Sequence, residues 1–273
     1  MYEIISKQKL APKIHLLKIR EPILAKKSLP GQFVVLKIDQ KGERIPLNIA
    51  DWDDEKGTID VVIFEKGATT LKLAMLNQGD SIVSLSGPLG LPTQIEKFGH
   101  VVCIAAGVAA GFIIPIAKAM KQKGNKVTSL IWQKNKKMVF WEDRLAEVSD
   151  RLIIATEDGS YGQKGPAPMM LKKILEKGEK IDRVNAMGPG PLLKACSDMT
   201  RPYGIKTMVS LHSIMVDGIG MCGSCRVSVG GQTKFACVDG PDFDGHQVDW
   251  KLFSARNNLY KNEEKIAAEQ HFS

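Results

Sequence analysis

The stretch HVVCIAAGVAAGFIIPIAKAMKQKG, residues 100–124, decides the fold class of the chain. Its first part, HVVCIAA, has the length and composition of a short buried strand, and its last part, FIIPIAKAMKQK, reads as a helix that ends at Gly124. Residues 98–117 carry no charge if His100 is neutral, so a membrane span is the alternative. Because Gly107, Gly111 and Pro115 interrupt the run, a strand, a glycine turn and a helix explain it better.

The sequence after residue 124 repeats this alternation of strand and helix. Further strands are predicted in the segments KVTSLIWQ (126–133), RLIIATED (151–158), DRVNAMGPG (182–190) and KTMVSLH (206–212). Helices are predicted in the segments 139–150, 167–179 and 191–204. Alternating strands and helices imply a parallel sheet with helices on its faces. We therefore predict a Rossmann-like domain over residues 97–211.

Residues 1–96 have a different pattern, typical of an antiparallel β-barrel. Short apolar runs recur as HLLKI, QFVVLKI, TIDVVIF and DSIVSLSG, with turn signals such as Pro30-Gly31 and Lys56-Gly57 between them. Only residues 71–77 suggest a short helix. The fold class predicted for the whole chain is thus a β-barrel followed by an α/β domain.

Residues 212–250 are rich in glycine, cysteine and aspartate and lack a long periodic segment. Asp217, Cys222, Cys225 and Cys237 follow the spacing D-x4-C-x2-C-x11-C. The plant-type ferredoxin pattern is C-x4-C-x2-C with a distant fourth cysteine, so the aspartate stands at the first position. This spacing predicts a [2Fe–2S] cluster held by the four residues, in a small module shaped by something other than a hydrophobic core.

Other interpretations of these cysteines stay open. A zinc site could recruit His212 or His246, and a water or His212 could take the place of Asp217. A redox-active dithiol is a further alternative, as are three cysteines that only pack. Cys103 and Cys196 fall in a predicted strand and helix, where we expect core residues.

The overall composition limits the partners and the compartment of the chain. Its 273 residues have a formal net charge of +8, yet only 6% are aromatic, and the basic cluster at residues 134–137 contains no aromatic side chain. A solvated lysine-rich surface is therefore favoured over nucleic-acid binding. Five cysteines, an odd number, and an N-terminus without an apolar leader predict a cytoplasmic protein. Residues 251–273 are expected to form a polar helical tail.

A barrel, a Rossmann-like domain and this cysteine segment together resemble the ferredoxin–NADP reductase superfamily, in its branch with a C-terminal [2Fe–2S] module. The branch includes the electron-transfer subunit of dihydroorotate dehydrogenase B and the small subunit of electron-bifurcating NADH-dependent ferredoxin–NADP oxidoreductase. The resemblance covers about residues 1–250. The aspartate within MVDGIGMCGSCRVSVGG looks like the second of these, because the dihydroorotate enzyme's subunit normally has four cysteines.

The resemblance implies an FAD site on the barrel. The segment RIPLN, residues 44–48, matches the strand along which FAD lies, and KGATT, residues 66–70, places amides and hydroxyls at a helix N-terminus suited to phosphate. A guanidinium pairs well with phosphate oxygens. The turn GPLG, residues 87–90, matches the family's barrel closure. The implied FAD-binding residues are Arg44, Pro46, Leu47, Asn48, Lys66, Gly67, Thr69 and Thr70.

The resemblance also implies an NAD(H) site on the Rossmann-like domain. The family's glycine-rich turn appears here as AAGVA, residues 105–109, in which alanines replace two or three glycines and narrow the approach of a pyrophosphate. The later elements TEDGSYG (156–162) and GPGP (188–191) match better. The implied nicotinamide-side residues are Gly107, Asp158, Gly159, Gly188 and Pro189. A scaffold that has lost its dinucleotide site is the alternative.

The function implied is an electron-transfer flavoprotein subunit, an oxidoreductase component that moves electrons between NAD(H), FAD and a [2Fe–2S] cluster. The resemblance implies a larger flavin and iron–sulfur subunit as the partner and electron bifurcation as the setting. The tail, with Asn258 and Tyr260, is a candidate docking arm. Two alternatives remain: a subunit that serves a dihydroorotate-type or other flavin dehydrogenase, and a redox-sensing relative without nicotinamide turnover.

Overall fold

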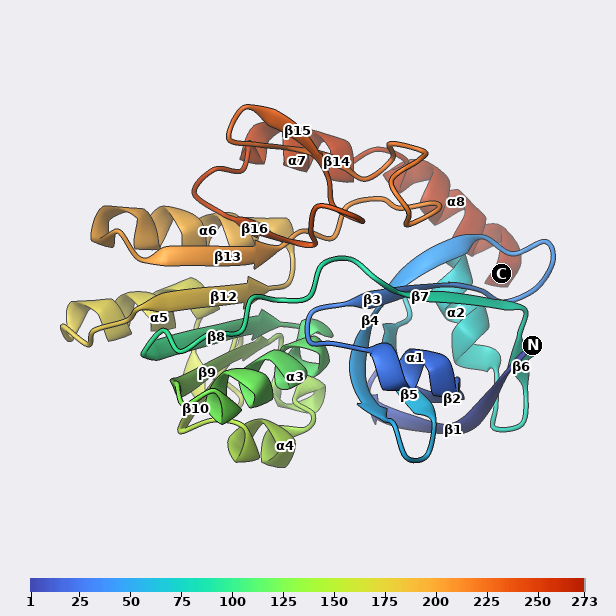
Figure 1. The fold of residues 1–273 in the computed structure, drawn as a ribbon, viewed down its shortest axis with the longest axis horizontal. Coiled ribbons are helices and arrows are strands. Elements are labelled where there is room, and N and C mark those ends of the chain that lie inside the picture. Colours follow the sequence, from blue (N-terminus) through green and yellow to red (C-terminus); the bar gives the residue numbers. More distant parts are fainter. Residues whose placement is uncertain (273) are drawn as a thin grey trace.

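The computed structural model describes residues 1–272 and arranges most of them around two seven-stranded sheets, each with its own core (Figure 1). In Figure 1 the first sheet lies on the right, in blue to cyan, and the second on the left, in green to orange. Within residues 1–272, no helix is both long enough and apolar enough to cross a membrane.

The first sheet is the predicted antiparallel barrel. Its strands are β1 (Tyr2–Ala11), β2 (Ile14–Arg20), β3 (Phe33–Lys37), β4 (Arg44–Asp53), β5 (Thr58–Phe64), β6 (Ser81–Ile82) and β7 (Ser84–Leu89). Their order is β6-β1-β2-β5-β4-β3-β7, so the two ends of the sheet are consecutive strands of the chain. The amide of Val83 between them donates to the carbonyls of Lys37 and Ile38, which nearly closes the barrel. Two short helices, α1 (Pro22–Lys27) and α2 (Ala68–Met75), accompany the strands.

The second sheet confirms the Rossmann-like prediction. Its strands are β8 (His100–Ala106), β9 (Lys126–Gln133), β10 (Arg151–Thr156), β11 (Gln163–Lys164), β12 (Arg183–Met187), β13 (Lys206–Ser210) and β16 (Asp242–Asp244). Their order is β11-β10-β9-β8-β12-β13-β16, parallel except for β16. The chain builds outward from β8 on one side and returns to β12 on the other, so the order of the strands reverses between β8 and β12.

Strand β8 is buried along its whole length because helices cover both faces of the sheet. Val101, Cys103 and Ala105 pack toward α3 (Ala109–Gln122), whereas the alternate residues pack toward α5 (Ala167–Glu176) and α6 (Gly190–Thr200). The prediction of Cys103 and Cys196 as core residues is confirmed, since both are fully buried.

The predicted helix over 139–150 is shorter in the structure. Helix α4 spans only Glu142–Glu147, because Trp141 adopts a left-handed backbone conformation with φ of 54°. The residues before it form a short 3₁₀ turn, η1 (Lys136–Met138), and a second such turn, η2 (Arg201–Tyr203), follows α6. Arg144 of α4 pairs with Asp51 of the barrel strand β4, which ties the two sheets together.

The cysteine-containing segment is not separate from the second sheet. It forms the hairpin β14 (Arg226–Val229) and β15 (Gln232–Phe235), and then adds β16 antiparallel to β13. Cys225, Val227, Cys237 and Phe243 are buried in the same hydrophobic cluster as residues of β8 and β12. The expectation that something other than a hydrophobic core shapes this segment is therefore wrong for these four residues, because they share the core of the second sheet.

Two helices end the described chain, as the predicted helical tail requires. They are α7 (Trp250–Asn257), which packs on α6, and α8 (Lys261–Phe272), which packs on α2 of the barrel. Figure 1 shows α8, in red, beside α2, in cyan. Residue 273 lies outside the described residues.

Candidate functional site

The carboxyl ends of β8 and β12 open into a cavity of about 1110 Å³ between the second sheet and the barrel. Gly107 follows β8 and Gly188 follows β12, and both line this cavity together with Pro189. In open α/β sheets, ligands bind outside the carboxyl ends of the strands at the point where the strand order reverses. The cavity lies at that point.

The barrel contributes the opposite wall of the cavity. The lining residues from β4 and from the loop and first turn of α2 include Pro46, Leu47, Asn48, Lys66, Gly67, Thr69 and Thr70. Arg44, on the same strand, lines an adjoining cavity of about 1170 Å³ that shares Lys66, Gly188 and His212 with the first. The structure thus brings together all eight residues expected at an FAD site.

The amides at the start of α2 are partly engaged within the loop. The backbone N–H groups of Lys66 and Gly67 donate to Oγ1 of Thr70, at 3.0 and 3.1 Å, and that hydroxyl donates to the carbonyl of Gly67. Thr69 donates its hydroxyl to Glu43 at 3.2 Å. Thr70 therefore shapes the loop, and Lys66 supplies the positive charge that faces the cavity.

The glycine turn after β8 is open toward the cavity despite its alanines. Gly107 has φ of 61°, and a Cβ added there would meet nothing within 4 Å. The amide of Gly107 donates to the carbonyl of Trp132, and Nε2 of Gln133 donates to the carbonyl of Gly107. The methyl group of Ala106 faces Gly188, where an added Cβ would lie 3.3 Å away. These contacts fix the turn and leave its outer side free for a ligand.

Asp158 and Gly159 are not brought to either cavity. They form a tight turn after β10, in which Oδ1 of Asp158 accepts hydrogen bonds from the hydroxyl and the amide of Ser160. These bonds lower the pKa of the Asp158 carboxyl. Glu157, one residue earlier, lines the cavity instead.

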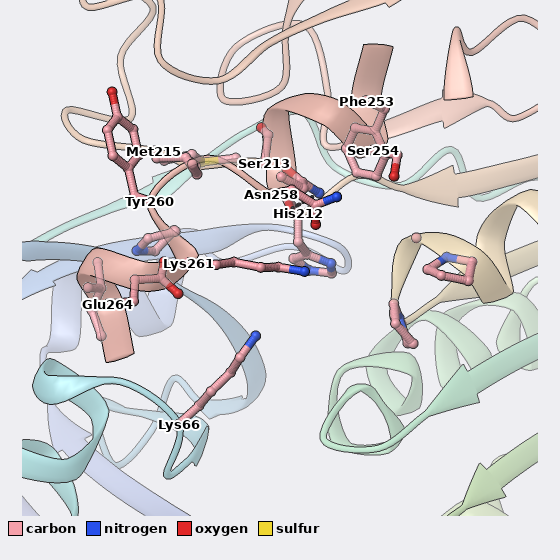
Figure 2. A pocket seen from close by; sticks show the side chains of 18 of the residues that line it. Lys66, His212, Ser213, Met215, Phe253, Ser254, Asn258, Tyr260, Lys261 and Glu264 are labelled. Atoms are coloured by element: carbon pink, nitrogen blue, oxygen red, sulfur yellow. Dashed lines mark hydrogen bonds between the residues drawn. The ribbon is translucent and has the colours of Figure 1, made fainter. Parts of the chain in front are cut away.

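Several lining residues went unpredicted because they come from distant parts of the chain. Glu157 and Lys134 directly follow the strands β10 and β9. Their position at strand ends could have predicted that they line the cavity. Tyr260 and Glu264, by contrast, reach the cavity only because α8 folds back onto the barrel. Figure 2 shows Lys66 and His212 pointing into the adjoining cavity from opposite sides, while the ring of Tyr260 points away from both.

The cysteine loop places its four predicted ligands in two pairs, Asp217 with Cys222 and Cys225 with Cys237. Sγ of Cys225 lies 3.1 Å from Sγ of Cys237, and both residues are buried, whereas Cys222 is exposed. Asp217 lies at the start of the loop, where Oδ1 accepts the amide of Ile219 and Oδ2 accepts the amide of Cys222. Within residues 1–272, no three Cys, His, Asp or Glu side chains lie close enough together to hold a metal ion.

The chemistry of this loop nevertheless fits an iron–sulfur cluster. Burial raises the pKa of the Cys237 thiol, with the neighbouring Cys225 adding to the effect, so the Cys237 thiol holds its proton until a metal displaces it. Hydrogen bonds from Ser224 lower the pKa of Cys222, and those from Ile219 and Cys222 lower the pKa of Asp217. Gly218, Gly220 and Gly223 have positive φ, which lets the loop curve around a bound group.

Comparison with known proteins agrees with this geometry. Residues 212–249 match the iron–sulfur cluster binding domain of dihydroorotate dehydrogenase B. The dihydroorotate dehydrogenase B (NAD(+)) electron transfer subunit homolog of Thermotoga maritima is 42% identical over 268 residues, which cover 98% of this chain and 94% of that protein. The chain belongs to the dihydroorotate dehydrogenase B electron-transfer subunit family. A probable member from Methanocaldococcus jannaschii is 33% identical over 80% of each chain.

A solved structure resembles this chain over its full length. A chain of the NADH-dependent reduced ferredoxin-NADP oxidoreductase structure, described for flavin-based electron bifurcation, superposes with a TM-score of 0.94. The two chains are 41% identical in sequence, and the superposition covers 100% of this chain and 98% of the other. The ferredoxin NADP+ reductase of Neisseria gonorrhoeae shares the fold alone, at 19% identity and a TM-score of 0.62. The predicted resemblance to both subunit types is therefore confirmed.

Proposed function

We propose that the chain is the subunit that moves electrons between NAD(H), FAD and a [2Fe–2S] cluster and passes them to a larger flavin and iron–sulfur subunit. The observation that carries this proposal is the contact between the cysteine loop and the barrel: Gly218 packs directly against Val35 and Leu89. Met215 and Val216, directly before Asp217, line the adjoining cavity, so a cluster in the loop would lie near a cofactor in the cleft. Flavins exchange electrons in pairs or singly, which suits a carrier between NAD(H) and a one-electron cluster.

The barrel side of the cleft would hold FAD. Arg44 would pair with the pyrophosphate and Lys66 would add a second positive charge, while Asn48 would hydrogen-bond the isoalloxazine ring. Pro46 and Leu47 offer apolar surface to the ring, and Gly67, Thr69 and Thr70 form the turn that supports the phosphates.

The second sheet would hold NAD(H) through Gly107, Gly188 and Pro189 at the strand ends. Asp158 and Gly159 stay predicted nicotinamide-side residues, although their turn lies away from both cavities. For the cluster, Cys222, Cys225 and Cys237 are the proposed thiolate ligands and Asp217 the fourth. We keep the division into residues 1–96, 97–211, 212–250 and 251–273, with β16 as the strand that joins the third part to the second sheet. A cytoplasmic location also remains a prediction.

The first test is a visible spectrum of the anaerobically purified chain before and after NADH. Flavin absorption that bleaches on NADH is the expected result. A flavin that only dithionite bleaches would overturn NADH entry through this subunit and favour the redox-sensing alternative. A purified chain with no flavin and no iron would overturn the whole proposal.

A pair of variants tests the FAD side separately. Arg44→Gln removes a charge-assisted contact, which is expected to weaken FAD binding by about tenfold or more. Arg20→Gln is the matched control, because Arg20 lies on β2 of the same barrel and pairs with Glu3 away from the cleft. Equal FAD affinity of the two variants would contradict the assigned position of the pyrophosphate.

The alternative of a dihydroorotate-type partner has support in the names of the relatives. Co-purification decides between the two, since one partner would be a dihydroorotate-oxidising flavoprotein and the other a larger flavin and iron–sulfur protein.

A further inference from the structure

One hydrogen bond connects the cysteine segment to the barrel wall of the cleft. Nε2 of His212 lies 2.8 Å from Oδ1 of Asn48, although 164 positions separate the two residues in sequence. Asn48 belongs to β4, and His212 follows β13 at the start of the segment that matches the cluster-binding domain. Both residues line the same cavity.

The chemistry of the two groups determines where the proton lies. An amide oxygen can only accept a hydrogen bond, so Nε2 of His212 must carry the hydrogen. His212 is exposed in the cleft, so the effect of burial is limited, but the protein around the ring still lowers its pKa below the ordinary value. In the uncharged ring, the hydrogen that Nε2 donates leaves a lone pair on Nδ1, on the side of the ring that is free in the cavity.

This contact orients the amide of Asn48. Because the oxygen accepts from His212, the two hydrogens on Nδ2 are the groups that Asn48 can offer to a ligand. Asn48 itself is only 6% exposed, so its side chain has little freedom to turn. A ligand beside it must present an acceptor, such as a ring nitrogen or carbonyl oxygen of an isoalloxazine.

The position of His212 is fixed independently of Asn48. The preceding amide, of Leu211, donates to the carbonyl of Pro241, and Asn257 of α7 donates to the carbonyl of His212 at 3.3 Å. The hydroxyl of Ser213 donates to the carbonyl of Cys225, a proposed cluster ligand. The backbone that carries the ring is thus held by the cysteine segment and α7, while the ring itself contacts the barrel.

We propose that His212 is a positioning residue for the flavin: by donating Nε2–H to Asn48, it directs the amide hydrogens of Asn48 into the cofactor cleft. The proposal rests on the proposed function, because it takes FAD to be the ligand of this cleft. A donor aimed at an acceptor of the ring stabilises the more electron-rich, reduced flavin. His212 therefore raises the reduction potential of the flavin from within the segment that holds the cluster.

Three variants of the full chain test the proposal. His212→Leu removes the donor, whereas His212→Gln keeps an N–H at the place of Nε2 and should restore the contact. His246→Leu is the matched control. His246 belongs to the same segment as His212, but its ring bonds Thr200 of α6 and does not line the cleft. Dye equilibration gives the flavin potential, fluorescence titration gives the FAD affinity, and iron analysis checks that the cysteine loop is intact.

We expect His212→Leu to lower the flavin potential and to weaken FAD binding about two- to tenfold, with unchanged iron content. His212→Gln and His246→Leu should stay close to wild type in both measurements. A potential and an affinity of His212→Leu equal to those of the control would overturn the proposal. So would a loss in His212→Gln as large as in His212→Leu.

A second measurement does not need bound FAD. Imidazole ¹⁵N spectra of the flavin-free chain should show His212 as the neutral Nε2–H form, and Asn48→Ala should shift only that ring. The Nδ1–H form would overturn the proposal, because Asn48 would then point its oxygen into the cleft. Failure of the wild-type chain to bind FAD at all would instead overturn the proposed function, while the spectra would still report on the contact.

Discussion

Substitution of Gly218 by alanine should lift the cysteine loop from the barrel. Gly218 has φ of +77°, and an added Cβ would lie 2.8 Å from Cγ2 of Val35 and 2.9 Å from Cδ1 of Leu89. The end of Leu89 can turn aside, but Val35 is β-branched and buried in β3, so its methyl group cannot move cheaply. To restore ordinary contact, the loop must shift by about 0.6 Å or more.

The expected loss of stability in Gly218→Ala is the sum of two free-energy costs. A left-handed conformation costs an alanine about 1–2 kcal/mol, and overpacking of a buried contact adds about 1–3 kcal/mol. Gly231 provides the matched control, because it has φ of +75° in the same segment and open space where its Cβ would be. Gly231→Ala should therefore lose only the free energy of the left-handed conformation and not that of overpacking. We expect Gly218→Ala to unfold about 2–6 °C below Gly231→Ala in a thermal melt.

The functional assay measures how fast the cluster is reduced after the flavin. Gly218→Ala should slow this reaction and Gly231→Ala should not, with comparable iron content in both. Val35→Ala in the Gly218→Ala background removes the clashing methyl group, so the double variant should lose less stability than the sum of the single variants. Equal losses in the two glycine variants, or strictly additive losses in the double variant, would refute the contact as the cause.

Three further outcomes follow from the same structure. Cys222→Ala should lose iron during anaerobic purification while Cys196→Ala, in the core of α6, should keep it. Asp217→Cys should retain iron and shift the visible spectrum of the cluster, and an Asp217→Ala variant with unchanged iron and spectrum would exclude the carboxylate as a ligand. Burial raises the pKa of Asp242, so the folded protein holds that proton longer than the unfolded chain and this carboxyl's contribution to stability declines as pH rises above about 4. Asp242→Asn should remove that decline in urea unfolding between pH 4 and 7.

The sequence predicted those parts of the fold that depend on local pattern. The apolar run at β8 is continuous because both of its faces are covered, and the strand order follows from alternation with helices. The short α4 was missed because Trp141 takes a left-handed backbone conformation that no periodicity records. The share of the cysteine segment in the main core was missed because its buried positions, such as Val227 and Phe243, are too scattered to form a period.

In the candidate site, too, residues that belong to a local motif were predictable and residues placed by long-range contacts were not. Residues that belong to a continuous motif, such as Asn48 on β4 and Gly107 in the glycine turn, are predictable from sequence and do line the cleft. His212 could be considered only as a metal ligand, because the partner that gives it another role is on a different sheet. Asp158 and Gly159 were assigned from a motif, but the turn after β10 bends them away while leaving Glu157 in place. Long-range contacts decide such cases, and a single sequence does not encode them as a pattern.

The contacts of the cysteine segment also explain how two redox centres can share one chain without a hinge between them. Gly218 packs on Val35 and Leu89, and His212 bonds Asn48, so two separate points of the segment are fixed to neighbouring strands of the barrel. Strand β16 fixes the far end of the segment to the second sheet. A movement of the second sheet relative to the barrel would have to strain at least one of these attachments. The proposed path for electrons therefore runs through a segment that is attached to both sheets.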